Sequence, residues 1–447
     1  MVRRRASFVD NPPTHSLLRE VRGMARPLRD PADLDPLLDR IGNRRVVLLG
    51  EASHGTREFY TWRTAITRRL VEEKGFSFVA VEGDWPDCYR VNRFAKGYSD
   101  TAAKPEEALE TFRRWPTWMW ANEEVKDLIG WLRGHNDSRP VGDKVGFYGL
   151  DVYSLWDSLH EVMGFLRRRD PSAFDAARRA LRCFEPYGEE AQEYARATLY
   201  GNESCRDEVI ELLRRVRADA KSIAGTEDER QFVAEQNALV VKNAEAYYRA
   251  MVRADNESWN IRDRHMAETL DRLLRHHGPK AKAIVWEHNT HIGDARFTDM
   301  TDEGTLNIGQ LAREKYGEYD VVLVGFATNR GKVIAGAAWD DPWQEMRVPP
   351  GRENSWEDVL HRAVPQDSLF VFPSDPSVEM SDWREHRAIG VVYRPQYEQF
   401  GNYVPTVLPR RYDALLYVDQ SAGVRPLFRP TESELPEEAP ETYPTGV

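Results

Sequence analysis

The sequence VVLLGEASHGT at residues 46–56 joins a short apolar run to a turn that carries a carboxylate and an imidazole. Four apolar residues that end at a glycine predict a buried strand, and the glycines of the segment let the backbone turn sharply. Arg57 opens a helical pattern, so strand, turn and helix form the first half of a βαβ unit. Ligands bind at such turns in open α/β sheets, and we therefore expect Glu51 and His54 to belong to a reaction centre.

A second strand is predicted at residues 76–81, directly before Glu82. The helical pattern between the two strands is about long enough for a right-handed crossover, which makes the strands parallel. The carboxyl ends of parallel strands meet at one edge of the sheet. Glu51 and Glu82 should therefore stand at the same edge, and neighbouring strands are one arrangement that brings them together.

The remaining chain divides by its patterns. Further strands are predicted at 145–151, which ends in a carboxylate, and at 281–286, 320–327, 333–336, 369–372, 389–393 and 414–418. Residues 154–278 carry a helical pattern without a strand signal, which predicts a helical insertion that covers the sheet. We expect an α/β core in two parts, 1–153 and 279–428, with a largely parallel central sheet and flanking helices. The tail at 429–447 is rich in Glu and Pro, which predicts disorder.

Composition limits the classes of function. The chain has 447 residues, of which 41% are hydrophobic and 30% charged, which is typical of a folded globular protein. A net charge of −11 argues against nucleic acid as a partner, because no basic surplus is available to neutralise phosphates. No window approaches the ~18 apolar residues of a membrane span, and no apolar segment follows the basic N-terminus as in a signal peptide. Cys88, Cys183 and Cys205 are too few and too scattered for a disulfide framework, so we expect reduced thiols in a cytoplasmic protein.

Acidic and imidazole side chains gather at the predicted strand ends. Three histidines and three glutamates follow strands: His54, His288, His291, Glu51, Glu82 and Glu287. One histidine in such a place is commonly a structural residue, but several strand ends of this kind can bring residues that are distant in sequence into one site. Another crowded segment contains Asn260, Arg262, Asp263 and His265. A surface lattice of ion pairs is a sufficient explanation for it, and a place beside the site is the alternative.

Three chemistries fit these residues. In the first, a histidine with a near-neutral pKa takes a proton from water while a carboxylate orients it. In the second, Glu and His side chains bind zinc, manganese or iron, although the sequence contains no H-E-x-x-H motif. The third is a serine nucleophile, which we rank last because no G-x-S-x-G occurs and the side chains of adjacent Ser53 and His54 diverge. A ligand-binding or haem-binding protein on the same sheet is the non-enzymatic alternative.

Several short motifs resemble those of the erythromycin esterase family, which includes macrolide esterases and members linked to succinoglycan biosynthesis. These motifs are G-E-x-S-H-G-T at 50–56, A-V-E at 80–82, N-x-R-D-x-x-M at 260–266, W-x-H-N-x-H at 286–291 and I-G-V-V-Y at 389–393. Arg63, nine positions after His54, stands where the family has an active-site arginine. The order and spacing of the motifs together carry the resemblance.

The resemblance implies a fold and a reaction. The implied fold is an α/β core with a long helical insertion and a small accessory α/β lobe. Characterised members of the family cleave the lactone ester of macrolide antibiotics without a covalent intermediate. The expected activity is therefore hydrolysis of a small-molecule carboxylic ester or lactone by histidine-activated water. No cofactor is required for this reaction, and a divalent metal among the same residues is the alternative.

The resemblance also assigns roles to individual residues. His54 is implied to be the base that activates water, and Glu51 to orient it. The remaining catalytic residues implied are Glu82 and Arg63, which complete the polar floor, and His288 and His291, which stabilise the oxyanion or protonate the leaving alkoxide. The residues expected to border the substrate are Asn289, Arg262 and Asp263.

Overall fold

The protein is an α/β structure built on one central sheet of nine strands. The computed structural model describes residues 11–167, 169–187, 191–199, 204–218, 226–253 and 256–428. The sheet has the order β1-β8-β11-β6-β2-β5-β3-β4, and β7 pairs with β6. Its strands are β1 (Arg26–Pro27), β2 (Val46–Leu49), β3 (Phe78–Asp84), β4 (Gly146–Asp151), β5 (Ala283–Trp286), β6 (Val321–Ala335), β7 (Gln344–Val348), β8 (Ser368–Val371) and β11 (Ala414–Ser421). The six strands from β11 to β4 are parallel, and β1, β7 and β8 pair antiparallel, which confirms the expected largely parallel sheet.

Helices cover both faces of this sheet. In the first half of the chain they are α1 (His15–Met24), α2 (Asp35–Ile41), α3 (Arg57–Lys74), α4 (Trp85–Lys96), α5 (Pro105–Leu109) and α6 (Glu123–Asp137). After β5 they are α13 (Asn289–Ile292), α14 (Ile308–Tyr316), α15 (Trp356–Ala363), α16 (Glu398–Gly401) and α17 (Leu408–Arg411). Alternate residues of β2 face opposite sides: Val47 and Leu49 pack with α2, α3 and α6, whereas Val46 and Leu48 pack with α1, α14 and α15. Such two-sided burial is why the strands read as continuous apolar runs in the sequence.

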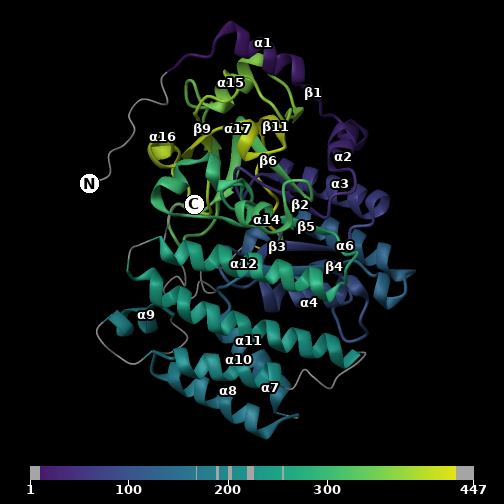
Figure 1. Cartoon of the computed structure of the whole chain (residues 1–447), viewed down its shortest axis with the longest axis vertical. Helices are drawn as coiled ribbons and strands as arrows, with labels where there is room; N and C mark the ends of the chain where they lie inside the picture. The colour runs from purple at the N-terminus through teal and green to yellow at the C-terminus, as the bar shows by residue number, and fades with distance from the viewer. Residues whose placement is uncertain are drawn as a thin grey trace.

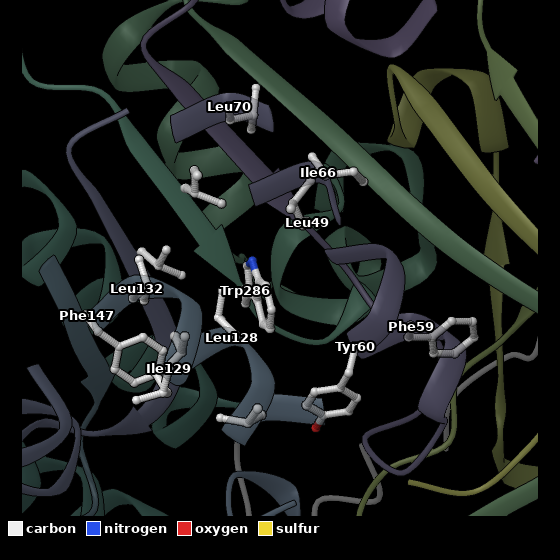
Figure 2. Packing of buried hydrophobic residues seen from close by; sticks show 14 of the residues in the cluster. Leu49, Phe59, Tyr60, Ile66, Leu70, Leu128, Ile129, Leu132, Phe147 and Trp286 are labelled. Carbon is white, nitrogen blue, oxygen red and sulfur yellow. The ribbon is translucent and has the colours of Figure 1, made fainter. Parts of the chain in front are cut away.

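The core on the α3 side of the sheet supports the turn at residues 50–56. Figure 2 shows Leu49 and Trp286 of the sheet among Tyr60, Ile66 and Leu70 of α3. All five side chains are buried. Full burial of each large apolar side chain is worth about 1.5–3 kcal/mol. The strand ends and the start of α3 are therefore held rigidly.

The helical region predicted at 154–278 is helical throughout its described residues. It comprises α7 (Leu155–Leu166), α8 (Pro171–Phe184), α9 (Ala191–Leu199), α10 (Arg206–Ala218), α11 (Thr226–Met251) and α12 (Glu257–His276). Figure 1 shows these helices stacked below the sheet, with α12 nearest to it. Side chains of α7 to α11 form a hydrophobic core of their own, and α12 packs on the sheet through Met266, Leu270 and Leu273. Among the described residues, no helix is long and apolar enough to cross a membrane.

A small antiparallel sheet accompanies the second part of the core. It consists of β9 (Arg384–Arg387) and β10 (Tyr403–Thr406). Residues of β6 and β7 pack with Ile389 and Tyr393 in a separate small hydrophobic cluster. The expected accessory lobe stays a prediction, and the predicted disorder of 429–447 lies outside the described residues.

Two strand predictions are wrong in detail. The strands expected at 320–327 and 333–336 are one continuous strand, β6, which passes Gly331 at a φ of 137°. Residues 389–393 form isolated bridges at Ile389 and Val392 and no strand, while the neighbouring strand β9 has the charged sequence REHR. Apolar, β-branched residues predicted a strand at 389–393 because they fit a buried, extended backbone, but no second strand lies alongside them. The bridge from Ile389 to Ser53 instead ties this segment to the turn that contains His54.

The expectation of reduced thiols is wrong for two of the three cysteines. Cys183 at the end of α8 and Cys205 just before α10 form a disulfide, with their Cα atoms 5.8 Å apart. The helical hairpin around α9 brings them together across 22 positions of sequence. Cys88 is a buried free thiol in the core. The expected cytoplasmic location stays a prediction.

Cys183→Ser should lower the stability of the helical region by about 3 kcal/mol. The disulfide closes a loop across 22 positions of sequence and so lowers the conformational entropy of the unfolded chain. The check is the melting temperature with and without dithiothreitol. Reductant should lower the melting temperature of the wild type and leave that of Cys183→Ser unchanged. Equal melting of oxidised and reduced wild type would contradict the prediction.

Candidate active site

The carboxyl ends of three central strands carry the predicted groups. Glu51 follows β2, Glu82 lies in the last part of β3, and Glu287 and His288 follow β5. The strands are parallel, as predicted, but the idea that those of Glu51 and Glu82 are neighbours is wrong, because β5 lies between them. The turn after β5 therefore places His288 between two acidic strand ends.

Close backbone approach explains both glycines of the turn at 50–56. Neither has a positive φ, so conformational freedom is not their role. A Cβ at Gly50 would lie 2.1 Å from the amide oxygen of Asn289, and one at Gly55 would lie 1.9 Å from the backbone oxygen of Ile334. A larger residue at either position would push the turn away from its neighbours.

His54 is held by a buried carboxylate. Its Nδ1 lies 2.9 Å from Oε1 of Glu51, and Arg63 donates to the other oxygen of Glu51 at 2.6 Å. The Arg63 guanidinium is completely buried between the rings of Tyr60 and Trp286, at 4.4 and 4.6 Å from their centroids. Because Glu51 can only accept, Nδ1 of His54 carries a proton, and Nε2 is the nitrogen left to act as a base. Burial lowers the pKa of His54, but Glu82 and the bond to Glu51 outweigh burial, so the pKa is raised above its usual value.

His288 has the opposite character. Its ring centroid lies 4.9 Å from that of His54. Its Nδ1 lies 2.8 Å from the Thr290 hydroxyl and accepts from the Thr290 backbone N–H, so the proton of the neutral ring is on Nε2. That Nε2 is buried without a hydrogen-bond partner among the described residues. Burial and the nearby His54 hold the pKa of His288 well below its usual range, so this histidine is a neutral donor.

Glu82 is fixed as an ionised carboxylate. Its Oε1 accepts from Arg262 at 2.6 Å, and its Oε2 accepts from the backbone N–H of His288 at 2.9 Å. Burial raises the pKa of Glu82, but His291, Arg262 and His54 together lower it well below its usual range. Arg262 also makes two hydrogen bonds to Asp151 at the end of β4, at 2.9 and 2.7 Å. Arg262 comes from α12, so the helical region supplies the counter-ion of a core carboxylate.

Both ring nitrogens of His291 have protein partners. Its Nδ1 lies 3.0 Å from each carboxylate oxygen of Asp263, and Nη1 of Arg262 lies 3.0 Å from its Nε2. An arginine only donates, so in this arrangement Nε2 accepts from Arg262. Trp259 of α12 stacks flat on the ring, with centroids 4.4 Å apart and 7° between the planes. In this arrangement His291 has no free N–H for a substrate.

The structure distributes the predicted substrate-contacting residues differently. Arg262 and Asp263 are buried in the site, so a surface lattice of ion pairs does not describe them. Asn289 lies beneath the site, where its side-chain amide makes two hydrogen bonds to the backbone of Phe326 and its backbone N–H donates to the backbone carbonyl of Glu51. His265 contacts Asn243 and lies near Asp151. The role of each residue toward a substrate stays a prediction.

Sequence reasoning did not assign Asp151, Tyr153 and Trp259 to the site. Asp151 carries the same signal as Glu82, an acidic side chain at a strand end. Tyr153 stacks under the Arg262 guanidinium at 4.9 Å, and Trp259 stacks on His291. No local pattern marks these aromatic contacts, because they depend on how α12 lies over the sheet. The hydroxyl of Ser53 pairs with that of Thr56 at 2.5 Å, which gives no support to a serine nucleophile.

The donor set does not fit a metal ion as it stands. Within the described part of the chain, no group of three or more His, Cys, Asp or Glu residues is arranged to hold one. His291 has both nitrogens bonded, and Glu82 has both oxygens bonded to protein donors. A metal would have to displace Arg262, whose charge already occupies the space between the carboxylates.

Comparison with known proteins finds relatives that are named as an esterase and a hydrolase. A family model described as erythromycin esterase matches residues 71–421. The chain is 24% identical over 323 residues to an erythromycin esterase type II of Escherichia coli. This alignment covers 68% of this chain and 73% of that protein. It is 20% identical over 409 residues to the putative hydrolase YbfO of Bacillus subtilis, covering 87% and 86% of the two chains.

Solved structures share the fold over almost the whole chain. A protein from Bacillus cereus matches with a TM-score of 0.77 and 18% identity, covering 92% of this chain and 99% of that one. A succinoglycan biosynthesis protein matches with a TM-score of 0.73 and 21% identity, covering 92% and 98%. A mutant of the erythromycin esterase EreC in its open conformation matches with a TM-score of 0.66 and 18% identity, over the same shares. Because the family model spans well over half of its length, this chain belongs to the erythromycin esterase family.

Proposed function

We propose that the protein is a hydrolase that cleaves a carboxylic ester or lactone with water activated by His54. Family membership already suggests an esterase or hydrolase. The observation that carries the finer proposal is the pair of histidines 4.9 Å apart with opposite environments. One has a raised pKa and a carboxylate on Nδ1, and the other is neutral with an unpartnered Nε2. Titratable groups whose pKa values are pushed apart identify the base and the donor of an acid–base pair.

The proposed reaction proceeds in two steps. Nε2 of His54 takes a proton from water as the oxygen attacks the ester carbonyl, which forms a tetrahedral oxyanion. Glu51 stabilises the resulting imidazolium, and its ion pair with Arg63 keeps the carboxylate oriented. As the C–O bond to the alcohol breaks, His54 returns the proton to the leaving alkoxide, so the products are a carboxylic acid and an alcohol.

We assign different roles to the two histidines that follow β5. His288 presents an N–H without a partner near His54, so it is the proposed oxyanion donor. His291 has both nitrogens bonded to Arg262 and Asp263, so we propose that it braces Arg262 against Glu82. In ester hydrolysis this makes His291 a positioning residue.

The proposal is tested by a hydrolysis screen. The panel should contain macrolide lactones, because one relative is named an erythromycin esterase, and acylated sugars, because one structural neighbour is a succinoglycan biosynthesis protein. Simple lactones and aryl esters complete the panel, and His54→Ala serves as the blank. Turnover of at least one ester above the blank supports the proposal. No turnover above the blank on any of them would reject it.

Chelation separates the histidine base from the metalloenzyme alternative. We expect dialysis against EDTA to leave kcat/KM unchanged, because Glu82 and His291 are bonded to protein groups and no three acidic, histidine or cysteine side chains of the described residues are arranged to hold a metal. The check is the hydrolysis rate before and after dialysis, together with metal analysis of the sample. Loss of activity that returns with Zn²⁺ or Mn²⁺ would favour the metalloenzyme, and a Soret band in the purified protein would favour haem binding.

A further inference from the structure

Glu287 is a buried carboxyl group that the proposed reaction does not use. Its side chain has no exposed surface, and neither carboxyl oxygen has a hydrogen-bond partner among the described residues. An ionised carboxylate in such a place loses its hydration without any compensating donor. A protonated carboxyl group loses much less hydration free energy on burial. Glu287 is thus unlike Glu51 and Glu82, whose oxygens are bonded to buried arginines.

The sheet places Glu287 beside Glu82. Val81 of β3 is in register with Trp286 of β5, so the next residues along the two parallel strands are Glu82 and Glu287. Val81 and Trp286 both pack in the core on the α3 side, and successive residues of a strand face opposite sides. Both glutamates therefore face α12. Two carboxyl groups so placed cannot both ionise without a strong mutual penalty.

The surrounding charges decide which carboxyl group ionises. The charged groups that act most strongly on Glu287 are Glu82 of β3, Asp151 of β4, and Arg262 and Asp263 of α12. Three of these four are acidic, and the hydrogen bonds of Arg262 go to Glu82, Asp151 and His291. Burial and Glu82 raise the pKa of Glu287 well above its usual range.

We propose that Glu287 is a neutral carboxylic acid in the folded protein and a positioning residue for the ionised Glu82 on the neighbouring strand. Because Glu287 keeps its proton, it adds no negative charge to the acidic cluster. The remaining carboxylates are those that Arg262 and the adjacent N–H groups can stabilise. Loss of that proton would put two negative charges side by side, and they would compete for Arg262. The effect on catalysis rests on the proposed hydrolase function, whereas the protonation state does not.

Infrared difference spectroscopy tests the protonation state directly. Wild type minus Glu287→Gln at pH 7 should contain the carbonyl band of a protonated carboxyl group. The matched control is Glu82→Gln, where the difference should contain carboxylate bands instead. A Glu287 difference with carboxylate bands would overturn the proposal. If Glu287→Gln does not fold, Glu287→Met removes the same group and is used in its place.

Stability against pH gives a second readout. Folded Glu287 keeps its proton while the unfolded side chain loses it near pH 4.3, so wild-type stability falls as pH rises above this value. Relative to wild type, the folded-to-unfolded ratio of Glu287→Gln should therefore grow by up to about tenfold per pH unit from pH 5 upward. Glu82→Gln should run parallel to wild type between about pH 5 and 6, because Glu82 is ionised in both states there and His54 titrates mainly at higher pH. If stability depends on pH in the same way in Glu287→Gln and in the wild type, the proposal is overturned.

Neither readout requires a substrate, so an absence of ester hydrolysis leaves this test intact. The positioning role is examined through the pH profile of kcat/KM. Wild-type activity should fall at alkaline pH as Glu287 ionises, and Glu287→Gln should lack this fall. An alkaline fall that wild type and Glu287→Gln share would reject the positioning role while the infrared result decides the protonation state.

Discussion

His54→Ala should lower kcat/KM for the best ester substrate by about 10²–10⁴-fold while the fold stays intact. The variant removes the only group in the proposed reaction that takes a proton from water. Such a loss corresponds to a barrier higher by roughly 3–5 kcal/mol. The measurement is steady-state hydrolysis of that ester, with circular dichroism and the melting temperature as checks on folding. Glu51 keeps its ion pair with Arg63 in the variant, which preserves the turn.

His361→Ala is the matched control for this variant. His361 on α15 forms the same kind of pair, with Nδ1 2.6 Å from the carboxylate of Asp419 on β11, and no hydrogen bond or ion pair joins it to the site within the described residues. It should keep wild-type activity. In the wild type, the pKa of His54 is raised, and only its neutral form is a base. Activity should therefore fall as pH drops through a value above the ordinary 6.5 of histidine. Retained turnover in His54→Ala, or equal losses in both variants, would contradict the assignment.

Glu82→Gln is expected to lower kcat by on the order of 10²-fold or more, as for loss of a positioned charged group in an acid–base site. The carboxylate of Glu82 binds Arg262, holds the backbone N–H of His288 and raises the pKa of His54. The amide removes the negative charge, so the pKa of His54 should fall. The acidic limb of the pH profile should therefore move to lower pH in this variant, which a merely structural defect would not produce.

Glu245→Gln makes the same chemical change at another buried glutamate. Glu245 on α11 binds Tyr194 and Arg249 within the helical region, and no hydrogen bond or ion pair joins these three residues to the site in the described part of the chain. Its activity and its pH profile should match those of the wild type. An unchanged rate in Glu82→Gln would remove Glu82 from the reaction. A lowered rate without movement of the acidic limb would show that its charge does not act on His54.

Local patterns in the sequence predicted most of the fold. The apolar runs at 46–49, 78–81 and 283–286 are strands because their side chains are buried on both faces. The long helical region could also be predicted from the sequence, because amphipathic spacing persists from α7 to α12. One error is at residues 389–393, where a strand-like sequence has no second strand to pair with. Another is the disulfide of Cys183 and Cys205, which depends on how distant residues meet.

The sequence by itself indicated which strand ends carry acids and imidazoles, because these residues follow directly on short apolar runs whose length and flanking residues favour a strand. The resemblance to the family pointed to Arg63 beside Glu51 and His54, and the structure brings the three side chains into hydrogen-bond contact.

Only the tertiary structure decided the order β2-β5-β3, and with it which carboxylates are neighbours. It also decided that Arg262 of α12 binds Glu82 and His291, and that His288 has a free N–H whereas His291 has none. The physical reason is that strand order and hydrogen-bond partners depend on contacts between residues far apart in sequence, from 29 positions for Arg262 and His291 to 206 for Glu82 and His288. Protonation states follow from those contacts, because burial and neighbouring charges set each pKa and no sequence spacing records them.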